Sequence, residues 1–221
     1  MKRRYKLLII ILISSVFTYI IFFINRSNKI SLVAIGDGIS SGETSFNIDG
    51  VSYNDYLKDY FYNKNLLKKF NNNYSYKNYK LKDILNDVNN NSNKINQILH
   101  YADIITISFG EEELTKLAIT KDLDLNYIKE FIDNYDKLLN IIKNISDSKI
   151  ILVGLYENSY LDNSKIIIIN SELSNIANKY NITFINISDL LLDKDYYVSK
   201  DNFYFNYKGH KEIAKLIINS L

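Results

Sequence analysis

The sequence predicts a three-layer α/β/α domain with a mostly parallel sheet, preceded by one N-terminal transmembrane helix. Two observations predict the sheet. Short unbroken apolar runs recur along residues 30–221, and segments with apolar residues at helical spacing separate them. A third observation predicts the helix, because residues 7–24 carry no charge. In a parallel sheet of this kind, ligands bind at the carboxyl ends of the strands.

The composition limits the sites that the chain can build. It has 221 residues and no Cys, which excludes disulfides, thiolate metal sites and a cysteine nucleophile. The formal charge of +2 hides an asymmetry, because residues 30–221 carry 21 basic against 25 acidic residues, a net of −4. A mildly acidic domain without a basic cluster is a poor nucleic-acid binder, so we expect no nucleic-acid partner. The Asn-rich patches near residues 71–73 and 89–93 are expected in loops.

Residues 7–24 are expected to anchor the protein in a membrane. At about 1.5 Å per residue the segment spans roughly 27 Å, close to a hydrocarbon core of about 30 Å. Four basic residues within the first six positions favour a cytoplasmic N-terminus. A cleaved signal peptide or a buried core helix is the alternative, but the run is long for the former and no A-x-A-like site follows. Residues 1–29 are therefore expected to form a basic tip, a single-pass anchor and a short linker, with domain 30–221 outside the cytoplasm.

Strands are expected wherever an apolar run is short and bounded. Residues 30–36, 102–109, 149–155 and 182–187 fit this description, and a weaker strand is expected at 74–79. Helices are expected where apolar residues recur every three or four positions. These segments are 53–70, 81–88, 95–101, 125–145, 166–180 and 206–221. Asn206 is placed to cap the last helix.

The turn that follows the first strand is where we expect the site. Residues 36–42 read G-D-G-I-S-S-G, so the turn offers backbone amides more than side chains. The next buried strand ends at Gly110 and the acidic triplet 111–113. Oxygen ligands for Ca²⁺ or Mg²⁺ could gather there. Successive turn residues point in different directions, however, and an acidic triplet suits a helix start. We expect no metal and no cofactor.

Four segments, in their order along the chain, resemble the SGNH (GDSL-type) hydrolases of the bacterial esterase-like branch. Residues 32–42, LVAIGDGISSG, resemble the first block, G-D-S-x-x-x-G after a strand. Residues 102–114, ADIITISFGEEEL, resemble the strand that ends in the G-x-N-D block, and residues 150–156, IILVGLY, resemble the fourth strand. Residues 201–214, DNFYFNYKGHKEIA, resemble the last block, D-x-x-H-P-N-x-x-G-x-x-x-I-A. The resemblance implies the flavodoxin-like SGNH fold over residues 30–221 and an ancestry in ester hydrolysis.

The same resemblance implies that the hydrolytic residues are missing. Family members use a serine of the first block, activated by an Asp and a His of the last block, with a Gly and an Asn among the oxyanion donors. Here Gly38 stands at the serine position, Glu112 at the Asn position and Tyr204 at the His position, while Asp201 remains. No glycine lies between residues 50 and 110 to supply the remaining donor.

These departures predict that hydrolysis is lost. A tyrosine has a pKa near 10, so Tyr204 would be a poor substitute for an imidazole base. Glu112 would place a carboxylate where a developing oxyanion needs donors, and losing a single donor typically costs about 2.7–4 kcal/mol.

Three residues are candidates for a rearranged active site. Ser40 or Ser41 could act as a displaced nucleophile, although turn serines usually bond or cap locally. His210 could replace the base, although it lies inside the last helix, at a position that usually packs. Asp37 and Asp201 are expected to shape their loops through hydrogen bonds.

We therefore expect a membrane-anchored, extracytoplasmic protein that binds a glycan, lipid or protein ligand at the cell envelope. Its pocket is expected to contain Asp37, Gly38, Gly110, Glu112, Asp201 and Tyr204. Two alternatives stay open: an active carboxylic-ester hydrolase or deacetylase with a rearranged site at Ser40 or Ser41, and an anchored scaffold without a small ligand.

Overall fold

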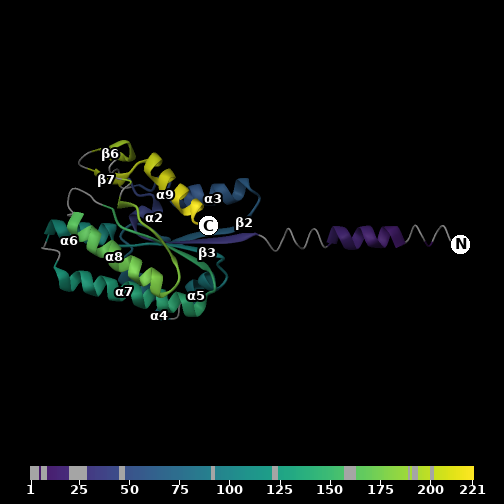
Figure 1. Ribbon diagram of the computed structural model, residues 1–221, viewed down its shortest axis with the longest axis horizontal. Coiled ribbons are helices and arrows are strands. Elements are labelled where there is room, and N and C mark those ends of the chain that lie inside the picture. Colours follow the sequence, from purple (N-terminus) through teal and green to yellow (C-terminus); the bar gives the residue numbers. More distant parts are fainter. Residues whose placement is uncertain are drawn as a thin grey trace.

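The computed structural model describes residue 5 and residues 9–19, 29–44, 48–90, 93–120, 124–156, 163–188, 190, 194–199 and 202–221. Within these ranges one parallel sheet is covered by helices on both faces (Figure 1). The expected three-layer α/β/α architecture is confirmed.

Five parallel strands form the middle layer in the order β2-β1-β3-β4-β5. They are β1 (Ile30–Gly36), β2 (Leu67–Ser75), β3 (Ile104–Ser108), β4 (Lys149–Val153) and β5 (Thr183–Ile185). The three central strands are almost wholly buried, because helices cover both of their faces, and this is why they are unbroken apolar runs. A separate antiparallel hairpin joins β6 (Tyr197–Ser199) to β7 (Asn202–Phe205), after the short 3-10 helix η2 (Lys194–Tyr196).

Two groups of helices pack on opposite faces of the sheet (Figure 1). Val33 and Ile35 of β1 face a core formed with α4, α5, α7 and α8, whereas Leu32 faces a core formed with α3 and α9. The helices are α2 (Gly38–Ser41), α3 (Tyr53–Asn63), α4 (Leu81–Asn89), α5 (Asn93–His100), α6 (Glu111–Thr120), α7 (Leu125–Ile145), α8 (Asn163–Lys179) and α9 (Tyr207–Asn219). Asn206 caps α9 as expected, by accepting hydrogen bonds from two backbone amides.

The expected helix over residues 53–70 is wrong in its second half. Helix α3 ends at Asn63, and Asn65 then adopts a left-handed φ of 56°, which asparagine tolerates better than most residues. The chain turns there and enters β2, where Phe70 packs beside the α3–α9 core. The strand expected at 74–79 shares only its first two residues with β2, and Asn71 to Asn73, expected in a loop, lie inside this strand. The Leu, Lys and Phe residues of this run have a spacing that a helix would also show. The spacing therefore does not distinguish an edge strand from a continuation of the helix.

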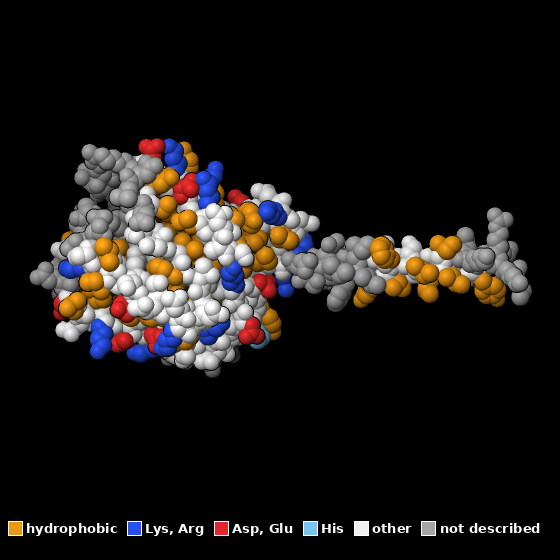
Figure 2. Space-filling model, in the orientation of Figure 1, with side chains coloured by type: hydrophobic (Ala, Val, Ile, Leu, Met, Phe, Trp, Pro, Cys, Tyr) orange, Lys and Arg blue, Asp and Glu red, His pale blue; other side chains and the backbone are white. Residues whose placement is uncertain are grey.

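The expected anchor over residues 7–24 lies partly outside the described residues. Residues 9–19 form a helix whose large apolar side chains are all more than half exposed (Figure 2). Within the described ranges, no helix has both the length and the apolar character that crossing a membrane requires.

Candidate functional site

The site is built where β1 and β3 end side by side, with Gly36 paired to Ser108. The strand order changes direction at β1, so the loops after these two strands open a crevice at the carboxyl edge of the sheet. Asp37 and the single turn of α2 follow β1. Phe109, Gly110 and helix α6 follow β3.

Asp37 joins the two loops. Its side chain is 2% exposed, and its Oδ2 accepts a hydrogen bond of 2.9 Å from the Gly110 amide, in the neighbouring loop and not in its own turn. Gly110 has a φ of +113°, and a Cβ there would lie 2.4 Å from the Phe131 ring, so only glycine fits. The hydrogen bond between the Gly110 amide and the Asp37 carboxylate therefore ties the loop after β3 to the turn after β1. Burial, and after it the negative charge of Asp37, raises the pKa of the Tyr135 phenol well above its usual value.

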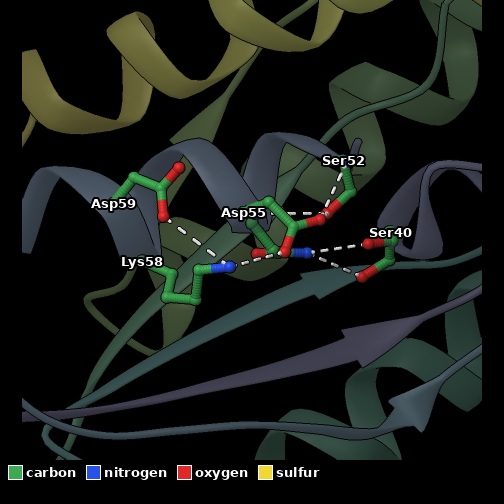
Figure 3. A network of polar contacts seen from close by, with 6 residues as sticks. Ser40, Ser52, Asp55, Lys58 and Asp59 are labelled. Atoms are coloured by element: carbon green, nitrogen blue, oxygen red, sulfur yellow. Dashed lines mark hydrogen bonds and ion pairs between the residues drawn. The ribbon is translucent and has the colours of Figure 1, made fainter. Parts of the chain in front are cut away.

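Ser40 lies in a buried polar network below the turn. Its hydroxyl accepts hydrogen bonds from Ser75 (2.8 Å) and from Asn54 Nδ2 (3.0 Å), and Asn54 Oδ1 accepts one from Thr106 (2.7 Å). These four residues come from α2, β2, α3 and β3, and each is at most 6% exposed. Figure 3 shows Ser40 directed at α3, on the side away from the helix's ion pairs. Among the described residues, neither a His nor a carboxylate is hydrogen-bonded to Ser40, so this serine links elements of the fold.

The start of α3 beside Ser40 is held by a capping box. Ser52 accepts a hydrogen bond from the Asp55 amide, and Asp55 accepts one from the Ser52 amide. Lys58 lies 3.2 Å from Asp55 and 3.6 Å from Asp59 (Figure 3). The box satisfies orphan amides of the first turn and so holds Asn54 in reach of Ser40.

Ser41 has a carboxylate neighbour but lies on the rim. Its hydroxyl donates to the Gly38 carbonyl (3.1 Å) and to Asp49 Oδ1 (3.2 Å), and Asp49 is exposed. Within the described ranges, no imidazole is bonded to Ser41.

His210 packs in the core. It is 3% exposed and lies against the rings of Tyr53, 6.4 Å between centroids, and Phe205, 5.9 Å away. Burial lowers its pKa to about 4, so the imidazole is neutral at pH 7. Among the described residues its Nδ1 has no hydrogen-bond partner.

A small cavity lies beside Gly38. Its volume is about 20 Å³, which is room for one water molecule. Two of the predicted pocket residues, Gly38 and Tyr204, line it, whereas Asp37 and Gly110 do not. The Glu112 side chain and Asp201 lie outside the described residues. The full lining is Gly38, Ile39, Glu43, Glu111, Tyr156, Tyr204, Phe205 and His210.

Glu43 fills the space that a side chain at position 38 would need. A Cβ built on Gly38 would lie 2.4 Å from Glu43 Oε2. Glu43 is 3% exposed and forms an ion pair with Lys77, and the Tyr204 hydroxyl donates a hydrogen bond of 3.2 Å to its Oε1. The residue at the family's histidine position therefore bonds to a carboxylate that blocks the family's serine position.

Sequence reasoning noted Glu111 as part of the acidic triplet 111–113 but did not identify Glu43 or Lys77. The signal for Glu43 is local: Gly42 has a left-handed φ of 81°, and the Glu43 amide donates to the Gly38 carbonyl over 2.8 Å. A glycine that reverses the chain directly after the turn brings the next side chain back over Gly38. No comparable signal pointed to Lys77, which lies beyond β2.

Comparisons with known proteins point in one direction. The model of the GDSL-like lipase/acylhydrolase family matches residues 32–217. Among solved structures, LAE5, an alpha/beta hydrolase enzyme from the metagenome of Lake Arreo in Spain, is 17% identical with a TM-score of 0.65 over 86% of this chain and 94% of its own.

Two further structures give the same picture. The lipase/acylhydrolase from Enterococcus faecalis is 17% identical, with a TM-score of 0.64 over 86% of this chain and 94% of its own. The acetyl xylan esterase AlAXEase is 13% identical, with a TM-score of 0.64 over 87% of this chain and 100% of its own. At these identities the structural likeness shows the fold alone. None of the curated proteins matches the sequence.

Proposed function

The chain belongs to the GDSL-like lipase/acylhydrolase family, and we propose that within it this protein binds a ligand instead of hydrolysing one. One observation carries the proposal: the Glu43 carboxylate occupies the space beside Gly38 where the family's nucleophile stands. A hydroxyl at position 38 is absent, and a side chain there would have to displace the Glu43 carboxylate, which is buried and ion-paired with Lys77.

The charges around the cavity support the same proposal. Ester hydrolysis develops an oxyanion, which needs hydrogen-bond donors or positive charge aimed at it. Glu43 and Glu111 both line the cavity and both are buried. Two carboxylates disfavour an oxyanion, and the Gly110 amide is already bonded to Asp37.

We further propose that the protein is a single-pass membrane protein, with its N-terminus in the cytoplasm and its domain outside. The exposed apolar side chains of residues 9–19 and the basic residues before them support this. A glycan, lipid or protein of the envelope would then be the ligand. The similarity to an acetyl xylan esterase makes a glycan the first class to test.

Ester turnover tests the loss of activity. The full chain, purified in detergent, is expected to hydrolyse p-nitrophenyl acetate no faster than its Ser40→Ala and Ser41→Ala variants. Turnover that either substitution abolishes would overturn the proposal. The anchor is tested separately, because an anchored chain stays in the membrane fraction after an alkaline carbonate wash and a peripheral one is released.

The alternative function, an ester hydrolase with a rearranged site, depends on Ser41. The 3.2 Å contact between Ser41 and Asp49 is the single observation that favours it. A carboxylate is a weaker base than an imidazole toward a hydroxyl, and Ser41 does not line the cavity. Loss of turnover in Asp49→Asn as well as Ser41→Ala would support this alternative.

A further inference from the structure

A groove of about 610 Å³ opens between the edge strand β2 and helix α5. It shares no lining residue with the cavity beside Gly38. Its floor is the start of β1, and its walls are formed by residues of β2 and α5. The groove is therefore a second concave surface, at a different part of the sheet.

The groove is positively charged on an acidic domain. Lys68, Lys69 and Lys94 line it, and no acidic residue does. Within the described ranges, none of these three lysines forms an ion pair. Because residues 30–221 carry a net charge of −4, the overall charge of the domain does not account for a groove with three cations. Such a surface attracts an anion.

Amide groups beside the lysines add hydrogen-bond donors. Asn71 Oδ1 accepts a hydrogen bond of 3.1 Å from the Asn73 amide, which leaves the NH₂ group of Asn71 to donate, and Gln97 lies on the opposite wall. Lysines with amide donors bind phosphate oxygens through charge-assisted hydrogen bonds.

The groove lies at the end of the domain where the chain enters from the N-terminal segment. Ser31 of β1, two residues after Lys29, pairs with Lys69 of β2. A linker of five residues, 25–29, spans at most roughly 18 Å. Tyr101 at the groove is 71% exposed, and exposed tyrosines are enriched at membrane interfaces. A linker this short keeps the groove within reach of the phosphate headgroups of the adjoining leaflet, with which lysines form charge-assisted hydrogen bonds.

We propose that this groove binds the phosphate headgroup of an anionic phospholipid in the leaflet next to the anchor. The proposal rests on the anchored orientation given above. Lys68, Lys69 and Lys94 supply the positive charge that attracts the phosphate, and the groove holds the sheet's amino-terminal end toward the membrane. The carboxyl edge, with the candidate site, then points away from the membrane toward the envelope.

Lysine reactivity tests the groove. The full chain in a neutral detergent is acetylated with an N-hydroxysuccinimide ester in the presence of dioctanoyl phosphatidylglycerol, dioctanoyl phosphatidylcholine or inorganic phosphate. Labelling at each lysine is read by mass spectrometry. Phosphatidylglycerol is expected to slow labelling of Lys68, Lys69 and Lys94 at least threefold, and phosphatidylcholine is expected to leave it unchanged. Three exposed lysines outside the groove serve as internal controls: Lys129, Lys137 and Lys211.

Variants with matched charge complete the test. Binding of fluorescent phosphatidylglycerol is expected to weaken at least fivefold in the triple variant Lys68→Gln/Lys69→Gln/Lys94→Gln. It is expected to stay unchanged in the control variant Lys129→Gln/Lys137→Gln/Lys211→Gln.

Equal lysine labelling with and without phosphatidylglycerol would overturn the proposal. The lysines would then have only the role of keeping the edge strand from pairing with another chain. Protection by inorganic phosphate alone would identify a soluble phosphate ligand and also overturn it. The labelling does not depend on the anchor or on the cavity, so failure of either earlier proposal is read separately.

Discussion

At the scale of single residues, Gly38 and Glu43 depend on each other. Any side chain at position 38 would overlap the Glu43 carboxylate, and the 2.8 Å bond between their backbones holds the two residues together. A serine at position 38 would therefore have to displace the Glu43 carboxylate from its place.

A double-mutant cycle measures this dependence. Gly38→Ser is expected to lower the free energy of unfolding by about 1–3 kcal/mol, because it overpacks a buried site. The loss is expected to shrink by about 1 kcal/mol or more when Glu43→Ala is also present. Urea unfolding gives these values. Glu113→Ala is the matched control, because Glu113 bonds to Tyr127 and not to the turn. Equal losses in all three backgrounds would show that Glu43 does not fill the space.

His210 makes stability depend on pH. Its pKa of about 4 in the folded protein lies below the ordinary value of 6.5, so below pH 6.5 the unfolded chain binds a proton that the folded chain does not. Stability is therefore lost as pH falls from about 6.5 to about 4. Between pH 7.5 and pH 4.5 the wild type is expected to lose about 2–3 kcal/mol more than His210→Phe, measured by urea unfolding. Identical losses in both proteins would mean that the imidazole is not kept neutral by burial.

At the scale of elements, the Ser40 network joins α2, α3, β2 and β3 behind the turn. Asn54 is its centre, because it bonds to the carbonyl and hydroxyl of Ser40 and to Thr106. The network sets the position of Gly38 by fixing the one-turn helix that contains it.

Removal of the Asn54 side chain tests this role. Asn54→Ala leaves buried groups of Ser40 and Thr106 without partners and is expected to cost about 2–4 kcal/mol in urea unfolding. Asn72→Ala, at an exposed position of β2, is the control and is expected to stay within about 0.5 kcal/mol of wild type. A small effect of Asn54→Ala would show that the turn is held by other contacts.

At the scale of the whole molecule, the sheet was predictable and the edge strand was not. Strands β1, β3 and β4 are buried on both faces, so each is an unbroken apolar run that stands out in the sequence. Strand β2 has one neighbour and is mostly exposed or half-buried, with its exposed residues in adjacent pairs, and its Leu, Lys and Phe residues continue the helical spacing of α3. Three residues separate the two elements, and the left-handed Asn65 among them gives little signal in a sequence rich in asparagine.

The candidate site was predictable in its location but not in its contents. The turn after β1 and the loop after β3 were identified because parallel strands end at a common edge. Glu43 and Lys77 were not identified, because Glu43 turns back over Gly38 after Gly42 and Lys77 reaches Glu43 from beyond β2. His210 was weighed as a base, and the aromatic core around it shows instead a packing residue.

A labelling experiment tests the central claim, that the nucleophile position is closed, most directly. The full chain is treated with a fluorophosphonate probe, which phosphorylates activated serines, and the modified residue is sought by mass spectrometry. We predict no modified hydroxyl, with an active serine esterase labelled in parallel as the positive control. Stoichiometric labelling of Ser40 or Ser41 would contradict the account.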